Sequence, residues 1–104
     1  MTKTVIAVDF DGTLCKAKYP DIGEPNKYLI DGLRLLQKYR NCFLILWTCR
    51  VGEYLDKAVE WCRFHGLEFD YINENAPFLI AKYGTDCRKV SADYYIDDKA
   101  LFGS

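Results

Sequence analysis

Acidic residues follow two apolar stretches of this chain, one near its start and one near its end. Asp9 and Asp11 come after a run of four apolar residues, and Asp97 and Asp98 follow a shorter run. Four carboxylates gathered in one cleft would repel one another unless a cation neutralised them. An all-oxygen set without His selects a hard ion such as Mg²⁺, which commonly bridges carboxylates to a substrate phosphate. The acidic residues therefore predict a magnesium site and phosphoryl-transfer chemistry.

The first acidic pair has a simpler interpretation as a solvated turn, because Asp and Gly are common turn formers. Gly12 directly follows Asp11 and lets the backbone turn sharply beside the carboxylates. Polar residues at the ends of later predicted strands favour the site over the turn.

The elements that must position these residues alternate between strand and helix. Continuous apolar runs predict strands, and apolar residues at helical spacing predict helices between them. The predicted strands cover residues 5–8, 42–47, 67–72 and 94–96. The predicted helices run from Pro25 to about Arg40 and from Gly52 to a C-terminal cap at Gly66, with a weak helical turn over 78–83.

This alternation is typical of a parallel sheet with right-handed crossovers, and it predicts one small doubly wound α/β domain over residues 1–104. Ligands bind at the carboxyl edge of such sheets, so Thr48, after the second strand, is expected to converge with the acidic residues. The segment 15–24 is expected to be irregular, too short for a cap domain but able to rim a pocket.

Two reactive side chains are given structural roles. His65 lies in the last turn of the second predicted helix, where the negative pole of the helix explains it better than a general-base role. Cys49, beside Thr48, is expected to be a small buried neighbour rather than a nucleophile.

The run Asp9-Phe10-Asp11-Gly12-Thr13 resembles the first motif of the haloacid dehalogenase-like (HAD) superfamily of hydrolases. Thr48 matches the second motif, Lys89 the third, and Asp97-Asp98 the fourth, so the resemblance covers nearly the whole chain. It implies a Rossmann-like sheet in which the first strand is central, with strand order 3-2-1-4.

The resemblance also implies a role for each matched residue. Asp9 is the nucleophile that forms an aspartyl-phosphate, and Asp11 is the general acid and base. Thr48 donates a hydrogen bond to the transferring phosphoryl group, and Lys89 stabilises the intermediate as a cation. The implied metal ligands are Asp9, the backbone carbonyl of Asp11, Asp97 and Asp98. Dehalogenating members lack the second acidic residue, so Asp11 favours a phosphatase.

Candidate substrate contacts are Gly12, Arg50 and Asn75, with Asn73 in the same polar loop. Arg50 is suited to a forked contact with phosphate, although a solvent-exposed ion pair is an equal alternative. Lys82 competes with Lys89 for the role of the motif lysine. Either Asp97 or Asp98 is the direct metal ligand, and Thr48 is also suited to cap the helix that follows it.

Composition limits the remaining function classes. The chain has 104 residues and a net charge of -1 without a clustered Lys/Arg face, which argues against non-specific binding to nucleic acids or membranes. A nucleic-acid substrate is neither indicated nor excluded. Five cysteines without a C-x-x-C pair, and no signal-peptide or membrane-spanning run, predict reduced thiols in the cytoplasm.

The sequence thus predicts a magnesium-dependent phosphomonoester hydrolase whose phosphorylated substrate is unidentified. With no cap, its pocket should be open, to be covered by a larger substrate or by a lid from a neighbouring subunit of a homo-oligomer. Two rival functions are a signalling module similar to response-regulator receiver domains and a catalytically idle binding protein on the same fold.

Overall fold

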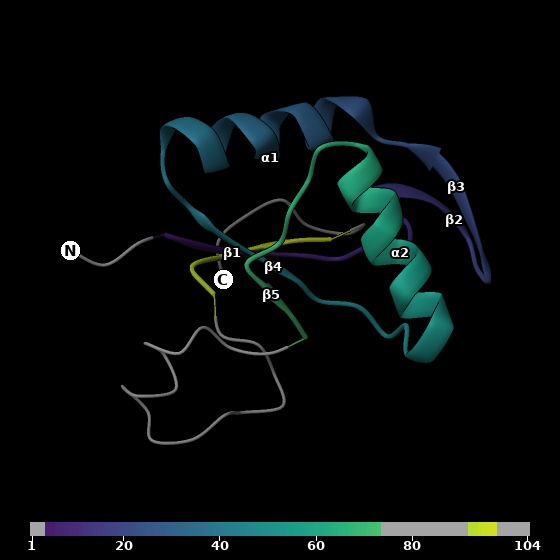
Figure 1. Ribbon diagram of the computed structural model, residues 1–104. Helices are drawn as coiled ribbons and strands as arrows, with labels where there is room; N and C mark the ends of the chain where they lie inside the picture. Colours follow the sequence, from purple (N-terminus) through teal and green to yellow (C-terminus); the bar gives the residue numbers. More distant parts are fainter. Residues whose placement is uncertain (1–3, 74–91, 98–104) are drawn as a thin grey trace, which may run out of the picture.

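A four-stranded parallel sheet forms the centre of the molecule. The computed structural model describes residues 4–73 and 92–97. The sheet order is β5-β4-β1-β6 (Figure 1). Its strands are β1 (Val5–Val8), β4 (Phe43–Leu46), β5 (Tyr71–Ile72) and β6 (Tyr94–Ile96). When only these four strands are numbered in chain order, the order is 3-2-1-4, as predicted. The α/β class and the central position of the first strand are therefore confirmed.

The register of the sheet aligns the carboxyl ends of its three adjacent strands. Val8 of β1 pairs in parallel with Leu46 of β4 and Ile96 of β6. All four residues of β1 are buried, which is why this strand is a continuous apolar run rather than an alternating one. The residues that follow Val8, Leu46 and Ile96 therefore lie side by side.

Helices α1 (Lys27–Tyr39) and α2 (Gly52–Phe64) pack on one face of the sheet. Buried residues of both helices share a core with Ile6, Val8, Leu44 and Leu46; they include Ile30, Leu33, Ala58 and Cys62. The second face carries a smaller buried cluster of Val5, Ala7 and Ile45. The described residues place no helix on that face, so the second helical layer of a doubly wound fold stays a prediction.

The helix boundaries differ slightly from those predicted. Pro25 ends a strand rather than opening α1, because Asn26 caps the helix by accepting a hydrogen bond from the Leu29 N–H at 3.3 Å. Gly66 ends the turn after α2 as predicted, with a φ of 84° that favours glycine.

The predicted third strand is mostly absent. Strand β5 contains only Tyr71 and Ile72, whereas residues 67–70 do not form a strand. Leu67 is buried, but its N–H donates to the Cys62 carbonyl at the end of α2. Asp70 pairs with Leu44 partly through its side chain, which accepts the Leu44 N–H at 2.8 Å. The apolar pattern therefore predicted the burial of Leu67 and the pairing of Tyr71 and Ile72 correctly, but it began the strand four residues too early.

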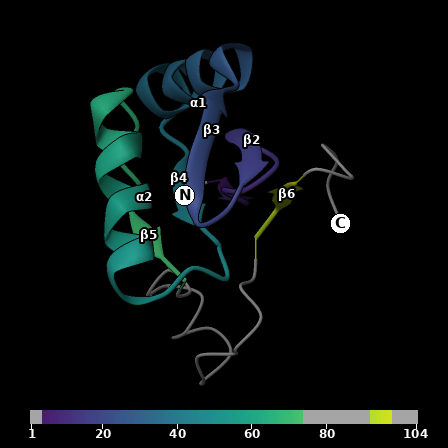
Figure 2. The same cartoon turned by 90° about the vertical axis from the view of Figure 1, so that its right-hand side faces the viewer.

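Residues 15–25 form an antiparallel hairpin rather than the expected irregular segment. Its strands are β2 (Cys15–Lys18) and β3 (Asp21–Pro25). Most of their side chains are exposed, so no alternation of apolar residues marks them in the sequence. The hairpin projects beyond the carboxyl end of β1 (Figure 1), and Figure 2 shows it from the side, with β6 and β5 at opposite ends of the sheet.

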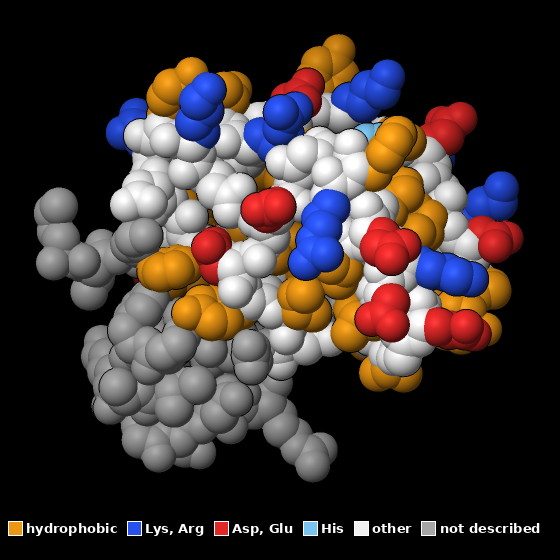
Figure 3. All heavy atoms as spheres, viewed as in Figure 1, with side chains coloured by type: hydrophobic (Ala, Val, Ile, Leu, Met, Phe, Trp, Pro, Cys, Tyr) orange, Lys and Arg blue, Asp and Glu red, His pale blue; other side chains and the backbone are white. Residues whose placement is uncertain are grey.

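The described surface carries charges of both signs. Figure 3 shows Lys and Arg side chains interspersed with Asp and Glu over α2. Neither described helix is long and apolar enough to cross a membrane. Among the residues described, the cysteines Cys15, Cys42, Cys49 and Cys62 are free thiols, and burial raises the pKa of the Cys62 thiol to about 12.

Candidate active site at the carboxyl edge of the sheet

Three of the predicted site residues line one cavity at the carboxyl edge of the sheet. Asp9 follows β1, Thr48 lies just beyond β4, and Asp97 follows β6; together with Cys49 they line a cavity of about 310 Å³. Two hydrogen bonds continue the pairing of the strands beyond their carboxyl ends. Trp47 N–H donates to Val8 O, and Asp9 N–H donates to Ile96 O, both at 2.9 Å. The predicted convergence is therefore present for these three residues. Lys89, Asn75 and Asp98, as well as the alternative Lys82, lie outside the described residues.

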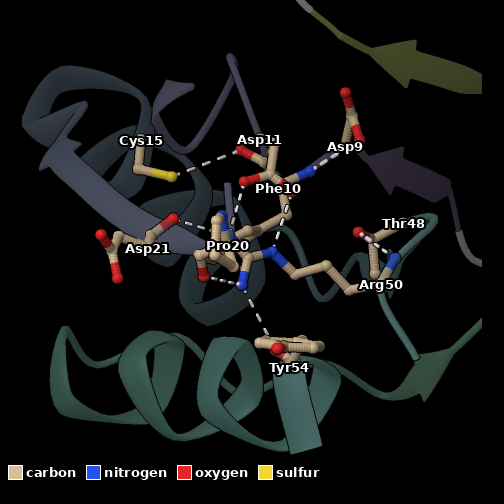
Figure 4. A network of polar contacts seen from close by, with 9 residues as sticks. All are labelled: Asp9, Phe10, Asp11, Cys15, Pro20, Asp21, Thr48, Arg50 and Tyr54. Carbon is tan, nitrogen blue, oxygen red and sulfur yellow. Dashed lines mark hydrogen bonds and ion pairs between the residues drawn. The ribbon is translucent and has the colours of Figure 1, made fainter. Parts of the chain in front are cut away.

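The loop after β1 sends its two carboxylates in different directions. Asp9 Oδ1 accepts the Phe10 N–H at 2.9 Å, and the Phe10 side chain is buried against Trp61 with ring centroids 5.4 Å apart. Gly12 has a φ of 82°, which favours glycine and turns the backbone back toward Cys15. As a result, the Asp11 carboxylate points toward Arg50, and that of Asp9 points away from it (Figure 4).

The guanidinium of Arg50 is buried and fully hydrogen-bonded. Its Nε and Nη2 donate to the two carboxylate oxygens of Asp11 at 2.9 and 2.8 Å. The other donations reach the backbone carbonyls of Pro20 at 3.2 Å, Asp21 at 2.9 Å and Tyr54 at 3.5 Å. A guanidinium has five N–H donors, so these five bonds leave none for a substrate phosphate. The hydrogen bonds that Arg50 donates to Asp11 raise the pKa of Arg50, against the opposing effect of burial.

Two aromatic rings complete the surroundings of Arg50. Its guanidinium carbon lies 5.0 Å from the ring centroids of both Phe10 and Tyr19, within the range of cation–π attraction. Arg50 is 2% exposed, so the alternative of a solvent-exposed ion pair is wrong. The predicted substrate contact is replaced by a contact that fixes Asp11 and ties the hairpin to the start of α2.

Two hydrogen bonds hold Thr48, one through its side chain and one through its backbone N–H. Its Oγ1 accepts the Arg50 N–H at 3.2 Å, and its own N–H donates to Asn73 Oδ1 at 2.8 Å. The helix-cap role for Thr48 is wrong, because the cap of α2 is Val51, without a side-chain hydrogen bond. A hydroxyl that accepts one bond still has a hydrogen to donate, so Thr48 can act as a donor to a bound group.

Cys49 and His65 are the two reactive side chains for which structural roles were expected. Cys49 is exposed, so its expected role as a buried neighbour is wrong; it follows the end of β4 and lies on the wall of the cavity. His65 lies at the C-terminal cap of α2, as expected, and its ring is 4.2 Å from that of Trp61. It is not on the wall of the cavity.

Sequence reasoning gave no site role to four residues of the cavity wall, Ala7, Trp47, Tyr95 and Ile96. All four lie in the apolar runs that predict strands. Strand periodicity offered a signal, because residues two positions before Asp97 and two positions after Ile45 share a face with them.

The described carboxylates of the cavity are compatible with magnesium. Among residues 4–73 and 92–97, no group of three or more His, Cys, Asp or Glu is arranged to hold a metal. Asp9 and Asp97 supply two carboxylates to the cavity, whereas the Asp11 side chain is bound to Arg50. Mg²⁺ is usually held by one or two carboxylates, with waters and substrate phosphate completing its shell, so this donor set fits it.

Comparison with known proteins gives one informative match. No protein-family model matches the chain, and no curated protein is significantly similar to it. A solved structure from Bacteroides thetaiotaomicron, described as that of a conserved protein coded by a locus, matches with a TM-score of 0.82 and 44% sequence identity. The match covers 99% of this chain and 82% of that chain. The description of the Bacteroides protein names no activity.

Proposed function

We propose that this chain, which belongs to the same family as the conserved protein from Bacteroides thetaiotaomicron, is a magnesium-dependent phosphatase of the haloacid dehalogenase-like type. The observation that carries the proposal is the cavity at the ends of three adjacent parallel strands. It combines a carboxylate on the central strand, Asp9, with a hydroxyl at Thr48 and a second carboxylate at Asp97. A nucleophile, a donor and an anionic metal ligand are the groups that phosphoryl transfer needs at one point.

In the proposed reaction, an Asp9 carboxylate oxygen attacks the phosphorus and the bond to the leaving oxygen breaks. The resemblance assigns to Asp11 the proton for that oxygen; Asp11 has to leave Arg50 and carry a proton to give it, so that the alcohol leaves neutral and Asp9 carries an acyl phosphate. Water then attacks the phosphorus, Asp11 takes the proton of the water, and phosphate leaves. Asp9 is thereby returned as a free carboxylate.

Arg50 acts in this scheme through Asp11 and not on the substrate. Its two hydrogen bonds of 2.8 and 2.9 Å fix the orientation of the Asp11 carboxylate. A general acid and base must stand within hydrogen-bond reach of the proton that it moves, and Asp11 is not on the wall of the cavity, so the proposed reaction requires Arg50 to release it. Arg50 therefore sets the position of the Asp11 carboxylate.

The transferring phosphoryl group would be held by Thr48 and, as the resemblance implies, by Lys89. A bound Mg²⁺ would neutralise negative charge on the phosphoryl group. Asp9 and Asp97 would hold the ion, and the Asp11 carbonyl and Asp98 stay predicted ligands. The four free thiols described suit a reducing compartment, and we propose a cytoplasmic location.

The signalling function is less compatible with the placement of the carboxylates. Receiver domains combine an acidic pair on the first strand with a phosphorylated Asp on a middle strand of the sequence. Here the strand in the middle of the sequence, β4, is followed by Trp47 and Thr48 instead. A binding protein without catalysis is separated from a phosphatase by the experiment below.

The test is phosphate release in Mg²⁺ from a panel of phosphomonoesters by the full chain and by Asp9→Asn. We expect turnover by the full chain and none by the variant, because the amide keeps the shape of the side chain but is not a nucleophile. Asp31→Asn, an exposed carboxylate of α1, is the matched control and should retain full activity. Near-normal activity in folded Asp9→Asn would overturn the mechanism, and no turnover of any ester would favour the binding protein.

A further inference from the structure

The cavity beside Asp9 has an apolar wall as well as a polar end. Besides its polar residues, it is lined by Ala7, Trp47, Tyr95 and Ile96. The phosphatase chemistry uses none of these four side chains. A pocket that combines a few polar groups with apolar and aromatic walls is typical of sites for organic ligands rather than for free phosphate.

The sheet register brings the two aromatic residues to the same face as Asp9. Ala7 pairs with Ile45 on one side and with Tyr95 on the other. Side chains two residues apart along a strand share a face, so the next row across the sheet is Trp47, Asp9 and Asp97. Adjacent strands are about 4.8 Å apart, which places Trp47 next to the proposed nucleophile.

The small side chain of Ala7 lets the two rings approach across β1. The ring centroids of Trp47 and Tyr95 are 5.9 Å apart, with the planes inclined at 62°. Tyr95 is fixed, because its hydroxyl accepts the Ala92 N–H at 3.1 Å and its ring packs on the buried cluster of the second face. Tyr95 is thus a rigid part of the wall.

Trp47 has a different environment from Tyr95. It is 36% exposed and belongs to neither buried cluster of the described residues, although it is one of the largest apolar side chains. An exposed indole at the rim of a cavity with two carboxylates is well placed to contact a ligand, because aromatic rings gain from stacking on one another.

We propose that the group joined to the phosphate in the substrate is a flat aromatic ring that lies against Trp47. The inference rests on the proposed function, since it assumes that the phosphate is bound at Asp9. The side chains of Ala7, Trp47 and Ile96 offer no hydrogen-bond acceptor, so the hydroxyl groups of a sugar or polyol would lose partners against this wall. An aryl ring has no such cost.

The test compares two phosphonates that differ in the flatness of one ring. Phenylphosphonate and cyclohexylphosphonate are titrated calorimetrically into the Mg²⁺-loaded full chain, with methylphosphonate as the ligand without a ring. Stacking predicts that the phenyl compound binds roughly two- to tenfold more tightly than the cyclohexyl compound. Equal affinities for the two compounds would overturn the inference.

Three variants test whether the preference for phenylphosphonate over cyclohexylphosphonate depends on Trp47. Trp47→Leu should abolish the difference while methylphosphonate still binds, and Trp47→Phe should keep most of it, because Phe is also flat. Phe64→Leu, which removes an exposed aromatic ring at the end of α2, should change nothing. A phenyl preference that persists in Trp47→Leu would also overturn the inference.

The proposed phosphatase function and the proposed aromatic substrate are contradicted by different results. If methylphosphonate binds and phosphate is released but no ring is preferred, only the aromatic wall is wrong. If the full chain neither binds methylphosphonate nor releases phosphate, the proposed function fails, and the aromatic substrate fails with it. The kcat/KM value for phenyl phosphate should then exceed that for glucose 6-phosphate, whose phosphate is joined to a sugar, and a higher value for glucose 6-phosphate contradicts the inference.

Discussion

At the scale of single residues, the contact between Arg50 and Asp11 matters most. The Arg50 side chain is 1% exposed and that of Asp11 is 25% exposed, so the ion pair is largely shielded from water. Such a pair stabilises a fold only if its remaining hydrogen-bonding groups are satisfied. Here three backbone carbonyls and two carboxylate oxygens meet that condition.

Arg50→Met should destabilise the protein by about 3 kcal/mol, because it leaves a partly buried carboxylate and three carbonyls without their donor. Urea unfolding of the full chain and the variant measures the difference. Arg34→Met is the matched control: its guanidinium is exposed and its closest carboxylate is 4.0 Å away, so we expect a change within about 0.5 kcal/mol. Equal losses in the two variants would contradict the buried ion pair.

Asp11→Asn should slow phosphate release by roughly 10²- to 10⁴-fold, the usual contribution of acid–base catalysis. The loss should be smaller for p-nitrophenyl phosphate than for an alkyl phosphate, because nitrophenolate leaves without a proton. Steady-state kinetics on both esters gives the comparison. The same loss on both would argue that Asp11 does not protonate the leaving group.

At the scale of elements, the hairpin β2–β3 is joined to the site through Arg50, which donates to the carbonyl of Pro20 in the turn and to that of Asp21 at the start of β3. Its pairing depends on Gly23, where an added Cβ would collide with the backbone carbonyl of Lys16. Backbone cannot move aside as a flexible side chain can, so the hairpin tolerates no larger residue there.

Two glycine substitutions should change stability in opposite directions. Gly23→Ala should lower the free energy of unfolding by about 1–3 kcal/mol, the usual cost of overpacking. Gly32→Ala, within α1 and with open space around the new Cβ, should raise it by about 0.5–1 kcal/mol, because alanine loses less entropy in a helix. Denaturant unfolding of both variants is the measurement, and a stabilised Gly23→Ala would contradict the hairpin geometry.

At the scale of the whole molecule, the proposed ion would link strands that are distant in sequence. Asp9 follows β1 and Asp97 follows β6, so a cation that binds both favours the folded chain over the unfolded one. The site is thus coupled to the stability of the sheet.

Thermal melts should show a Tm that rises with Mg²⁺ concentration and returns to its starting value with EDTA. Asp9→Asn should reduce the rise, whereas Asp31→Asn, far along the chain in α1, should retain it. A Tm that stays constant up to saturating Mg²⁺ would mean that these carboxylates do not form the proposed site.

The sequence by itself determined the alternation of strands and helices and the place of the candidate site, whereas the order of the sheet followed from the family resemblance. A strand that is hydrogen-bonded on both sides and buried on both faces must be apolar throughout, so β1 and β4 were visible as uninterrupted runs. The polar residues at their ends then had to meet at one edge, which is where Asp9, Thr48 and Asp97 lie.

Only the tertiary structure decided the partners of the side chains. Arg50 and Asp11 are 39 positions apart, and no local pattern indicates that an arginine after one strand will turn back to a carboxylate after another. The meeting of Trp47 with Tyr95 likewise depends on the register of both strands with β1 and on the small side chain of Ala7 between them. Periodicity reports which face a residue occupies, because it reflects burial along one element; a contact between elements depends on their packing, which is fixed only when the chain folds.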